Sequence, residues 1–374
     1  MAFLRPALDK TIHEPNLLRE GLRSGVRLDG RGHQDFRPAE IRTERGEFSS
    51  TAEVQLDVTR VVCFVRGEVV APYPDRPTEG MVQFNAALSV AAESAGFTSN
   101  DVVRMLEKAI RESDAIDTES LCIVGGEHVW LITCDVRVLD YGGCILDASL
   151  LAASVAIRAF RKPDVSVVSA EGEDFSTASK LIFHKSDERE PLPLALHHTP
   201  LAVSFAIFAD QPERHNKIAD VDDKDSSSSS SKSDEKILLV SDPLGEEEAA
   251  MDGSIMYSLN SDNELCALHK PGGTALTPAV ILRAMKIASI RSAQLHKDVD
   301  AALKDLDARV ESERERRVTL MQEITARALQ KQGASSDPAT SGGAAPVVTD
   351  EKGGISKNDV ILSWQLLHRP SEAI

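Results

Sequence analysis

The chain has 374 residues, of which 42% are hydrophobic and only 4% aromatic. That length suffices for two domains with their own cores and some unfolded sequence. The formal net charge of −17 excludes a general nucleic-acid coat, because such proteins need excess lysine and arginine to displace counterions. Any contact with nucleic acid must therefore come from a local basic face.

The cysteine spacing and the hydropathy exclude further kinds of site and further classes of protein. Five cysteines lie far apart, with no C-x-x-C pair and no clustered histidines, so we expect reduced, buried thiols and neither a metal site nor a disulfide framework. No apolar run approaches the length that spans a bilayer, and residues 1–14 lack a long apolar core. We expect a soluble intracellular protein without membrane contact and without a cofactor.

The first half of the chain reads as strands followed by a buried helix. Apolar and polar residues alternate over 54–58 and an apolar run follows at 61–65, which predicts a hairpin with one buried face. A second alternating series, from Trp130 to Val138, predicts a strand with an inner and an outer side. Residues 147–160 are apolar almost all round, which predicts a helix buried against a sheet and N-capped by Asp147.

The second half predicts a further sheet and a long helix. Strands are expected at 201–208, 237–240, 254–259 and 265–268. Thr277 suits an N-cap and is followed by a proline at the first helical position, so a long helix should begin there. Its apolar stripe is thin beyond Leu303, with Leu306 and Val310 among many charges. That part is either a solvated extension of the core helix or a surface for a partner.

Two segments have compositions that cannot bury enough apolar surface to fold. An acidic and serine-rich stretch within 211–236 predicts a disordered surface loop, either a tolerated insertion or a phosphorylation site at Ser233. Residues 333–354 have the composition of a flexible linker. The apolar cluster at 360–367, which includes Trp364, is a candidate docking motif in the tail.

A series of short motifs points to a known family. The chain has RLDGR at 27–31 and DFRP at 35–38, and further motifs follow in order. These are RGE at 66–68, PYPDRP at 72–77 with Glu79-Gly80, FN at 84–85, RES at 111–113, IDTESL at 116–121 and RKPDVSV at 161–167. The series resembles the RNase PH family of phosphate-dependent exoribonucleases over roughly the first four fifths of the chain, and within it the ring subunits of the eukaryotic RNA exosome.

The resemblance implies an α+β architecture. This is the RNase PH fold, with a split β-α-β core like that of ribosomal protein S5 domain 2, a second smaller α/β domain and a helical, partly disordered C-terminal tail. The boundaries that follow are an N-terminal helical segment at 1–24, domain 1 at 25–190, domain 2 at 191–303, a charged helical extension at 304–332 and a flexible tail at 333–374.

The resemblance also indicates where phosphate would bind in an active enzyme. Phosphorolysis needs a cradle for the attacking phosphate, made of backbone N–H groups at a helix start and an arginine. Active members carry Gly-Gly, then threonine or serine, then arginine, whereas this chain has Gly142-Gly143-Cys144-Ile145. An isoleucine cannot offset the charge of an oxyanion, and losing a charged contact of this kind costs roughly several kcal/mol. We predict a degenerate phosphate site.

The expected carboxylates are also incomplete. Asp252 keeps one family carboxylate, and the acidic run at 246–248 stands where the second would be, as a remnant or a solvated acidic turn. Asp147 lies close to the supposed phosphate site and would repel the anion. The sequence therefore predicts a protein that is not a nuclease by itself.

Basic residues on a predicted helix over 101–112 suggest a surface for RNA. Arg104, Lys108 and Arg111 fall at i, i+4 and i+7, which places them on one face. The resemblance implies that these three, with Arg76, contact the RNA backbone without reading its sequence. The alternative is a set of surface residues in salt bridges with interleaved glutamates.

These features lead to one hypothesis and two alternatives. The resemblance implies a non-catalytic subunit that pairs with an RNase PH-like neighbour in a hexameric ring, alongside S1/KH cap subunits and a hydrolytic nuclease. Such a subunit would thread RNA during 3′–5′ processing and degradation, including rRNA maturation, in the nucleus, nucleolus and cytoplasm. The alternatives are an active phosphate-dependent exoribonuclease and a purely structural scaffold without RNA contact.

Overall fold

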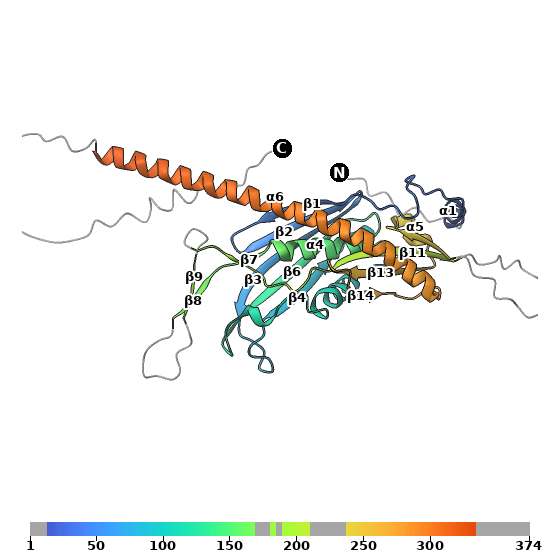
Figure 1. The fold of residues 1–374 in the computed structure, drawn as a ribbon, viewed down its shortest axis with the longest axis horizontal. Coiled ribbons are helices and arrows are strands. Elements are labelled where there is room, and N and C mark those ends of the chain that lie inside the picture. The colour runs from blue at the N-terminus through green and yellow to red at the C-terminus, as the bar shows by residue number, and fades with distance from the viewer. Residues whose placement is uncertain (1–12, 169–179, 185–188, 210–236, 334–374) are drawn as a thin grey trace, which may run out of the picture. The chain divides into compact units, whose positions relative to one another are not determined.

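The computed structural model describes residues 13–168, 180–184, 189–209 and 237–333, drawn in colour in Figure 1. Residues up to Arg314 form one compact unit, and Glu315–Ile374 form a second. The predicted loop within 211–236 and the candidate docking motif at 360–367 lie outside the described residues.

The first sheet has six strands, and β4 runs parallel to β6 whereas the other pairs are antiparallel. Its order is β1-β2-β3-β6-β4, with β5 also paired to β6. The strands are β1 (Glu40–Arg45), β2 (Ser49–Leu56), β3 (Thr59–Val70), β4 (Met81–Ala87), β5 (Cys122–Val124) and β6 (His128–Asp140). Between β4 and β5 lie α2 (Val90–Ser94), α3 (Ser99–Leu106), the π-helical turn η1 (Glu107–Arg111) and the 3₁₀ turn η2 (Glu119–Leu121).

The period-2 pattern predicted the buried face of this sheet. Every second residue of β6 from Trp130 to Val138 is buried, as expected, and β2 and β3 form the predicted hairpin. Val58, expected on the buried face, is 58% exposed. The strand ends at Leu56, and Asp57 takes a left-handed φ of 55° to reverse the chain, so Val58 lies in the turn.

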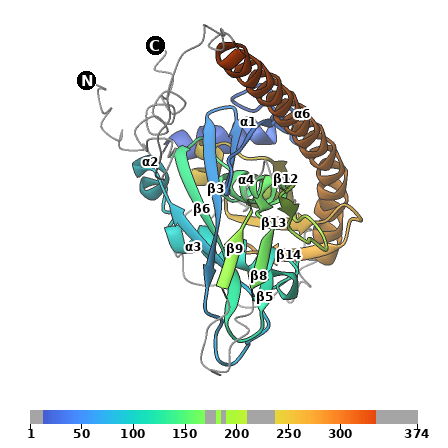
Figure 2. The same cartoon turned by 90° about the vertical axis from the view of Figure 1, so that its left-hand side faces the viewer.

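Helix α4 (Ile145–Ala159) covers the sheet and is buried along almost its whole length. It packs on β2 and β3, on the face of the sheet that looks toward α6 (Figure 2). Its alanines allow this close approach, and Ser50 of β2 donates a 2.7 Å hydrogen bond to the carbonyl of Ala156. The helix starts two residues earlier than predicted, and its N-cap is Cys144, so the prediction that Asp147 caps it was wrong.

The second sheet has the order β12-β11-β13-β14 and is antiparallel throughout. Its strands are β11 (Leu201–Ala209), β12 (Ile237–Ser241), β13 (Gly253–Leu259) and β14 (Leu265–His269), so each strand predicted in this half is confirmed to within one residue. Helices α1 (His13–Arg23) and α5 (Gly245–Ala250) pack at one side, where Leu22 joins a small buried cluster with Phe208 and Val240. Two short ladders, β7 (Arg161–Lys162) with β10 (Leu192–Pro193) and β8 (Val165–Val168) with β9 (Lys180–Phe183), complete the strands.

Helix α6 (Pro278–Gly333) starts at the predicted proline. Ala284 and Ala288 pack on the second sheet, whereas Leu303 and Leu306 are buried in the larger cluster beneath the first sheet. The thin stripe thus belongs to the core, which favours the predicted extension of a core helix. In the second unit, the part of α6 after Arg314 carries exposed apolar side chains at Val318, Leu320, Met321 and Ile324. Among the described residues, no helix is both long and apolar enough to cross a bilayer.

Candidate phosphate site and basic surface

The start of α4 is a tight turn built from two glycines and a left-handed cysteine. Gly143 has φ +102°, and Cys144 has φ +56°. Thr59 holds this turn, since its hydroxyl donates to the carbonyl of Gly143 at 2.7 Å and accepts from the amide of Gly142 at 3.1 Å. The first amides of the helix point out of this turn, which is the geometry that binds an anion.

The side chains that follow do not supply a phosphate clamp. Ile145 is fully buried and belongs to the main hydrophobic cluster. The thiol of Cys144 is also buried and points at the carbonyl oxygen of Pro243, 3.5 Å away. Burial and three nearby carboxylates raise its pKa well above the ordinary value, so the thiol stays neutral. Neither side chain can offset the charge of a bound phosphate.

A carboxylate of the protein already occupies the anion position at this helix start. The backbone amide of Cys144 donates to Oε1 of Glu248 at 2.8 Å, and the hydroxyl of Tyr141 donates to Oε2 at 2.7 Å. Burial raises the pKa of Glu248, although both hydrogen bonds act in the opposite direction. The donor that would cradle phosphate is therefore satisfied from within the chain.

Glu247 of the acidic run is structural as well, whereas Glu246 is exposed. Glu247 is fully buried and forms a bidentate pair with Arg27, at 3.0 and 2.7 Å. Arg27 also donates to the carbonyls of Ser241 and Asp242. The prediction that this run is a solvated turn was wrong for Glu247. Arg27, in the RLDGR motif, thus ties the segment after α1 to α5 and to the end of β12.

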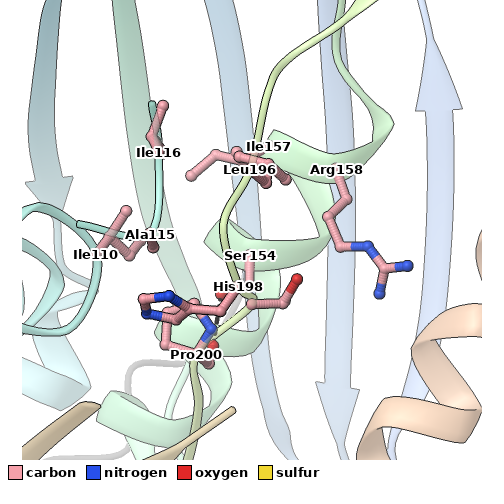
Figure 3. A pocket seen from close by; sticks show the side chains of 10 residues that line it. Ile110, Ala115, Ile116, Ser154, Ile157, Arg158, Leu196, His198 and Pro200 are labelled. Carbon is pink, nitrogen blue, oxygen red and sulfur yellow. Dashed lines mark hydrogen bonds between the residues drawn. The ribbon is translucent and has the colours of Figure 1, made fainter. Parts of the chain in front are cut away.

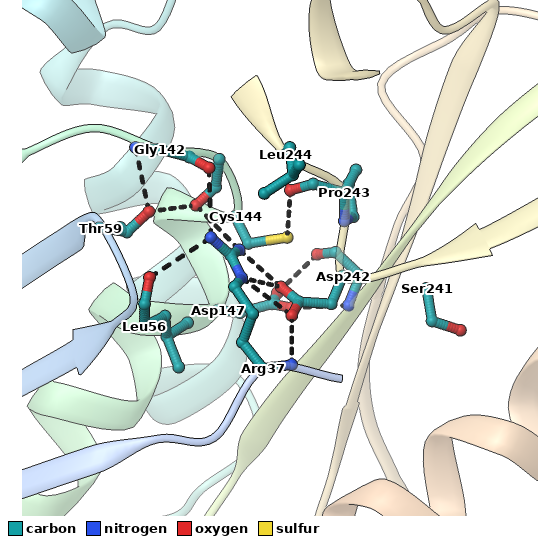
Figure 4. A network of polar contacts seen from close by, with 12 residues as sticks. Arg37, Leu56, Thr59, Gly142, Cys144, Asp147, Ser241, Asp242, Pro243 and Leu244 are labelled. Carbon is teal, nitrogen blue, oxygen red and sulfur yellow. Dashed lines mark hydrogen bonds and ion pairs between the residues drawn. The ribbon is translucent and has the colours of Figure 1, made fainter. Parts of the chain in front are cut away.

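Arg37 and Asp242 form the centre of the polar network beside α4 (Figure 4). The guanidinium donates to both carboxylate oxygens of Asp242, the shortest contact being 2.6 Å, and also to the carbonyls of Leu56 and Gly142. Burial acts to raise the pKa of Asp242, but the hydrogen bonds and charge of Arg37 prevail and lower it to about 2. This ion pair ties the second sheet to the turn before α4.

Asp252, the predicted residual carboxylate, lies in another network. It accepts from Arg19 of α1 at 2.7 Å and from the backbone amide of Ala209 at 2.9 Å. Within the described chain, no hydrogen bond joins it to residues 142–145. The structure therefore does not bring this carboxylate into contact with the degenerate phosphate site, and it acts as a tie between α1 and β11.

Asp147 links α4 to the second sheet. Its carboxylate accepts from the backbone amide of Ser204 at 2.7 Å and from the Ser204 hydroxyl at 2.5 Å. Burial raises the pKa of Asp147 to about 7, from an ordinary 3.8, against the opposing effect of these two bonds. The carboxyl group is thus partly protonated near neutral pH.

The raised pKa of Asp147 predicts a pH-dependent effect of substitution. The folded state binds this proton more tightly than the unfolded chain, so its stabilising contribution is full below pH 3.8 and is lost as pH rises to about 7. We expect Asp147→Asn to leave stability nearly unchanged at about pH 3.5, where the carboxyl group is largely protonated in both states, and to raise it by about 1 kcal/mol or more at pH 8. Urea unfolding at both pH values measures this. Asp305→Asn, on the exposed side of α6, is the control; an effect of Asp147→Asn that is equal at both pH values would contradict the assignment.

The predicted basic residues fall into two groups. Arg76 and Arg111 line the same hollow, about 640 Å³ in volume, between β4 and η1. Arg104 and Lys108 lie near β14, where burial and then the charges of Lys108 and Arg104 lower the pKa of His269. Arg111 is separated from them because the hydrogen bonds of η1 span five residues, which widens the turn and rotates the residues after it.

Each cation of these groups has a different environment. Lys108 donates to the carbonyl of Leu268 at 2.6 Å and so blocks part of the edge strand β14. The side chain of Arg104 is exposed, and its guanidinium makes no hydrogen bond or ion pair with the described residues. The alternative of interleaved salt bridges applies to Arg111, which pairs with Glu107 at 3.0 Å, and to Arg76, which pairs with Glu79 at 3.3 Å.

A second cavity is too small for a substrate. It has a volume of about 10 Å³, enough for about one water molecule, and lies between η1, α4 and the segment before β11 (Figure 3). Most of its lining is apolar, and His198 beside it contacts the Ser113 hydroxyl at 3.0 Å. Among the described residues, no group of three or more His, Cys, Asp or Glu side chains could hold a metal ion.

Family models match both halves of the compact unit. The model described as the 3′ exoribonuclease family, domain 1, matches residues 35–163, and that of domain 2 matches residues 198–291. The chain belongs to the RNase PH family of 3′ exoribonucleases. The two matches correspond to the two sheets with their helices, so the predicted family and α+β fold are confirmed.

Curated relatives show which kind of RNase PH family member the chain is similar to. The exosome complex component RRP45A of Arabidopsis thaliana is 34% identical over 78% of this chain and 87% of its own length. The component RRP45 of Rattus norvegicus is 36% identical over 80% of this chain, but the match covers 62% of the rat protein. The Schizosaccharomyces pombe component rrp45 is 31% identical over 75% of this chain and 86% of its own length. The predicted resemblance to exosome ring subunits is thus confirmed.

Solved structures of exosome chains have a fold similar to that of this chain. A chain of the Archaeoglobus fulgidus exosome with RNA bound to the active site aligns with a TM-score of 0.56 and 27% identity, over 76% of this chain and 97% of that chain. A chain of an archaeal exosome core aligns with a TM-score of 0.54 and 27% identity, over 77% of this chain and 96% of that chain.

The sequence analysis missed the groups that form hydrogen bonds around the turn before α4. Glu248 and Tyr141 are 107 residues apart, and Arg37 and Asp242 are 205 apart, so no local spacing joins them. The sequence did contain one signal. Arg37 belongs to the DFRP motif, and an arginine that becomes buried needs an acidic partner elsewhere in the chain.

Proposed function

We propose that this chain is a catalytically silent subunit of the exosome core ring, of the RRP45 type, that contributes to assembly and to RNA threading. The observation that carries the proposal is the Glu248 carboxylate on the Cys144 amide, next to a buried Ile145. A phosphate entering this site would meet the Glu248 carboxylate in its position, and the nearby guanidinium of Arg37 is already paired with Asp242. The relatives of the RRP45 type support the same assignment.

The proposal includes partners and location. The chain pairs with an RNase PH-like neighbour in a hexameric ring beneath S1/KH cap subunits, and a separate hydrolytic nuclease supplies the cleavage. RNA passes 3′ end first, in processing and degradation that include rRNA maturation, in the nucleus and nucleolus and also in the cytoplasm. Purifying the complex through a tagged chain, with subunits identified by mass, tests the partners, and imaging of the tagged chain tests the location.

Catalytic silence predicts a negative result in a phosphorolysis assay. Purified chain, alone and with its ring neighbour, should release no nucleoside diphosphates above background from labelled RNA in inorganic phosphate. An assembled ring with a family member of known phosphorolytic activity is the positive control. Release of diphosphates that requires inorganic phosphate would establish the alternative of an active phosphorolytic exoribonuclease.

Reversing the charge of two arginines distinguishes a role in RNA binding from that of a purely structural scaffold. In reconstituted rings, Arg104→Glu combined with Arg111→Glu should weaken RNA protection at low salt, because phosphate contacts depend on cations near the path. Arg42→Glu combined with Arg66→Glu, two exposed arginines of β1 and β3, is the matched control. Unchanged protection in the double variant, with intact rings, would favour the scaffold alternative.

A further inference from the structure

The hollow beside η1 has the size and the lining of a nucleotide site. Its volume of about 640 Å³ lies within the usual range of about 300–1,000 Å³ for small-molecule sites. Backbone hydrogen bonds fix its outer loop, since Gly80 donates to Thr118 at 2.9 Å and Gly126 donates to Pro77 at 2.9 Å. The hollow is thus formed before any ligand arrives.

Part of the lining of this hollow is apolar. Residues of β4, η1 and β6, together with one residue after η1, contribute apolar side chains. They are Met81, Val82, Phe84, Ile110, Ile116 and Leu131. Phe84, Ile110 and Ile116 are buried in the main hydrophobic cluster, so the apolar floor of the hollow is continuous with the core. Stacking and apolar contact with such a floor is how single-stranded nucleic acids are held without sequence preference.

The two arginines of the hollow are held by glutamates. Arg76 pairs with Glu79 at 3.3 Å and Arg111 with Glu107 at 3.0 Å, and Asp114 also lines the hollow. Two cations therefore face three carboxylates, so the empty hollow does not attract a free anion. Both pairs are solvent-exposed, and exposed pairs contribute only about 0–1 kcal/mol each, so a ligand can break them at little cost.

The π-helical turn explains why one of these pairs faces the hollow. The amide of Glu112 donates to the carbonyl of Glu107 at 2.9 Å, a bond that spans five residues. The wide turn places Glu107, Ile110 and Arg111 together on the hollow while Lys108 is held at β14. π-Helical turns are rare and often occur at functional sites.

We propose that this hollow binds one unstacked nucleotide of single-stranded RNA, and that Glu79 and Glu107 act as exchangeable counter-ions. On binding, the RNA phosphates replace the two glutamates on Arg76 and Arg111, and the base lies on the apolar floor. The inference rests on the proposed RNA-threading function and deepens it. The glutamates keep the arginines from trapping free anions, so binding requires a base and a phosphate together.

Neutralising the glutamates should strengthen RNA binding. In reconstituted rings, we expect Glu79→Gln with Glu107→Gln to tighten the Kd for a short oligouridylate at low salt by about 3- to 10-fold, since each competing carboxylate is removed. Glu93→Gln with Glu40→Gln removes the same charge from exposed positions outside the hollow and should change the Kd far less. Equal changes in the two double variants would overturn the exchange mechanism.

The position of the base is tested by cross-linking. RNA that carries 4-thiouridine, irradiated in the wild-type ring, should cross-link to residues of β4 or η1 that line the hollow, mapped by mass spectrometry. Replacing the same nucleotide by an abasic one should weaken binding. Cross-links only outside the hollow would overturn the base site, as would an abasic RNA that binds equally well.

The outcomes distinguish this inference from the proposed function. If Arg104→Glu with Arg111→Glu weakens RNA protection but the glutamate variants match their controls, the RNA role stands and this inference fails. If neither set of variants alters RNA binding, both fail. If the glutamate variants instead disrupt ring assembly, the hollow receives a basic side chain of a neighbouring subunit, which also overturns the inference.

Discussion

Replacing Arg37 by methionine should destabilise the compact unit by up to roughly 3–5 kcal/mol, because it leaves the buried carboxylate of Asp242 with Arg31 as its remaining ionic partner. The loss is a large part of the roughly 5–15 kcal/mol that stabilises an ordinary domain. The guanidinium also satisfies the carbonyls of Leu56 and Gly142, which methionine cannot do. Urea unfolding monitored by circular dichroism measures the change.

Arg42→Met is the matched control for this experiment. Its guanidinium is exposed and contacts Glu40 at 3.5 Å, so its replacement should cost less than about 1 kcal/mol. A second variant, Asp242→Asn, keeps the shape of the carboxylate and should also destabilise, because it leaves Arg37 charged and buried. If Arg37→Met cost no more than Arg42→Met, the network of Figure 4 would not be the tie described above.

Replacing Gly143 by alanine should have the second large effect. A Cβ atom at this position would lie 2.3 Å from the carbonyl oxygen of Pro243 and 2.8 Å from the amide nitrogen of Gly245, both backbone atoms. Such contacts require the turn before α4 or the chain before α5 to move. The left-handed φ of +102° adds strain for any residue with a side chain. We expect a loss of about 3 kcal/mol or more in urea unfolding.

Gly96→Ala separates the two causes of that loss. Gly96 has a similar φ of +96°, but nothing lies within 4 Å of the position a Cβ would take. This variant should therefore show the backbone strain alone, about 1–2 kcal/mol. Equal losses for Gly143→Ala and Gly96→Ala would mean that the close approach between the two halves of the compact unit contributes nothing.

Local patterns were enough to predict most of the fold. The alternation from Trp130 to Val138 and the apolar runs that became β11 and β13 follow the period of a strand, which packing then preserved. The pair Thr277-Pro278 marked the start of α6 because proline is favoured where its missing N–H is not needed. The sequence alone was thus enough to predict the buried face of these strands.

The site was less predictable because its partners are distant in the chain. Asp147 reads as an N-cap from its position before an apolar run, yet its carboxylate reaches Ser204 on another sheet. The acidic run at 246–248 reads as a solvated turn, because nothing local reveals that Arg27 and the start of α4 will meet it. The π-helical turn has no sequence signature either, so the separation of Arg111 from Lys108 could not be foreseen.

The hydrogen bonds of Glu248 also illustrate a trade-off between the stability of a fold and its activity. An enzyme must leave donors without partners at the place where its substrate will bind, and those open donors make the resting protein less stable. Here the chain completes its own hydrogen bonds at that place, since the Cys144 amide and the Tyr141 hydroxyl both end on one carboxylate. The hydrogen bonds of Glu248 therefore stabilise the compact unit at the turn where the proposed silent site lacks an arginine.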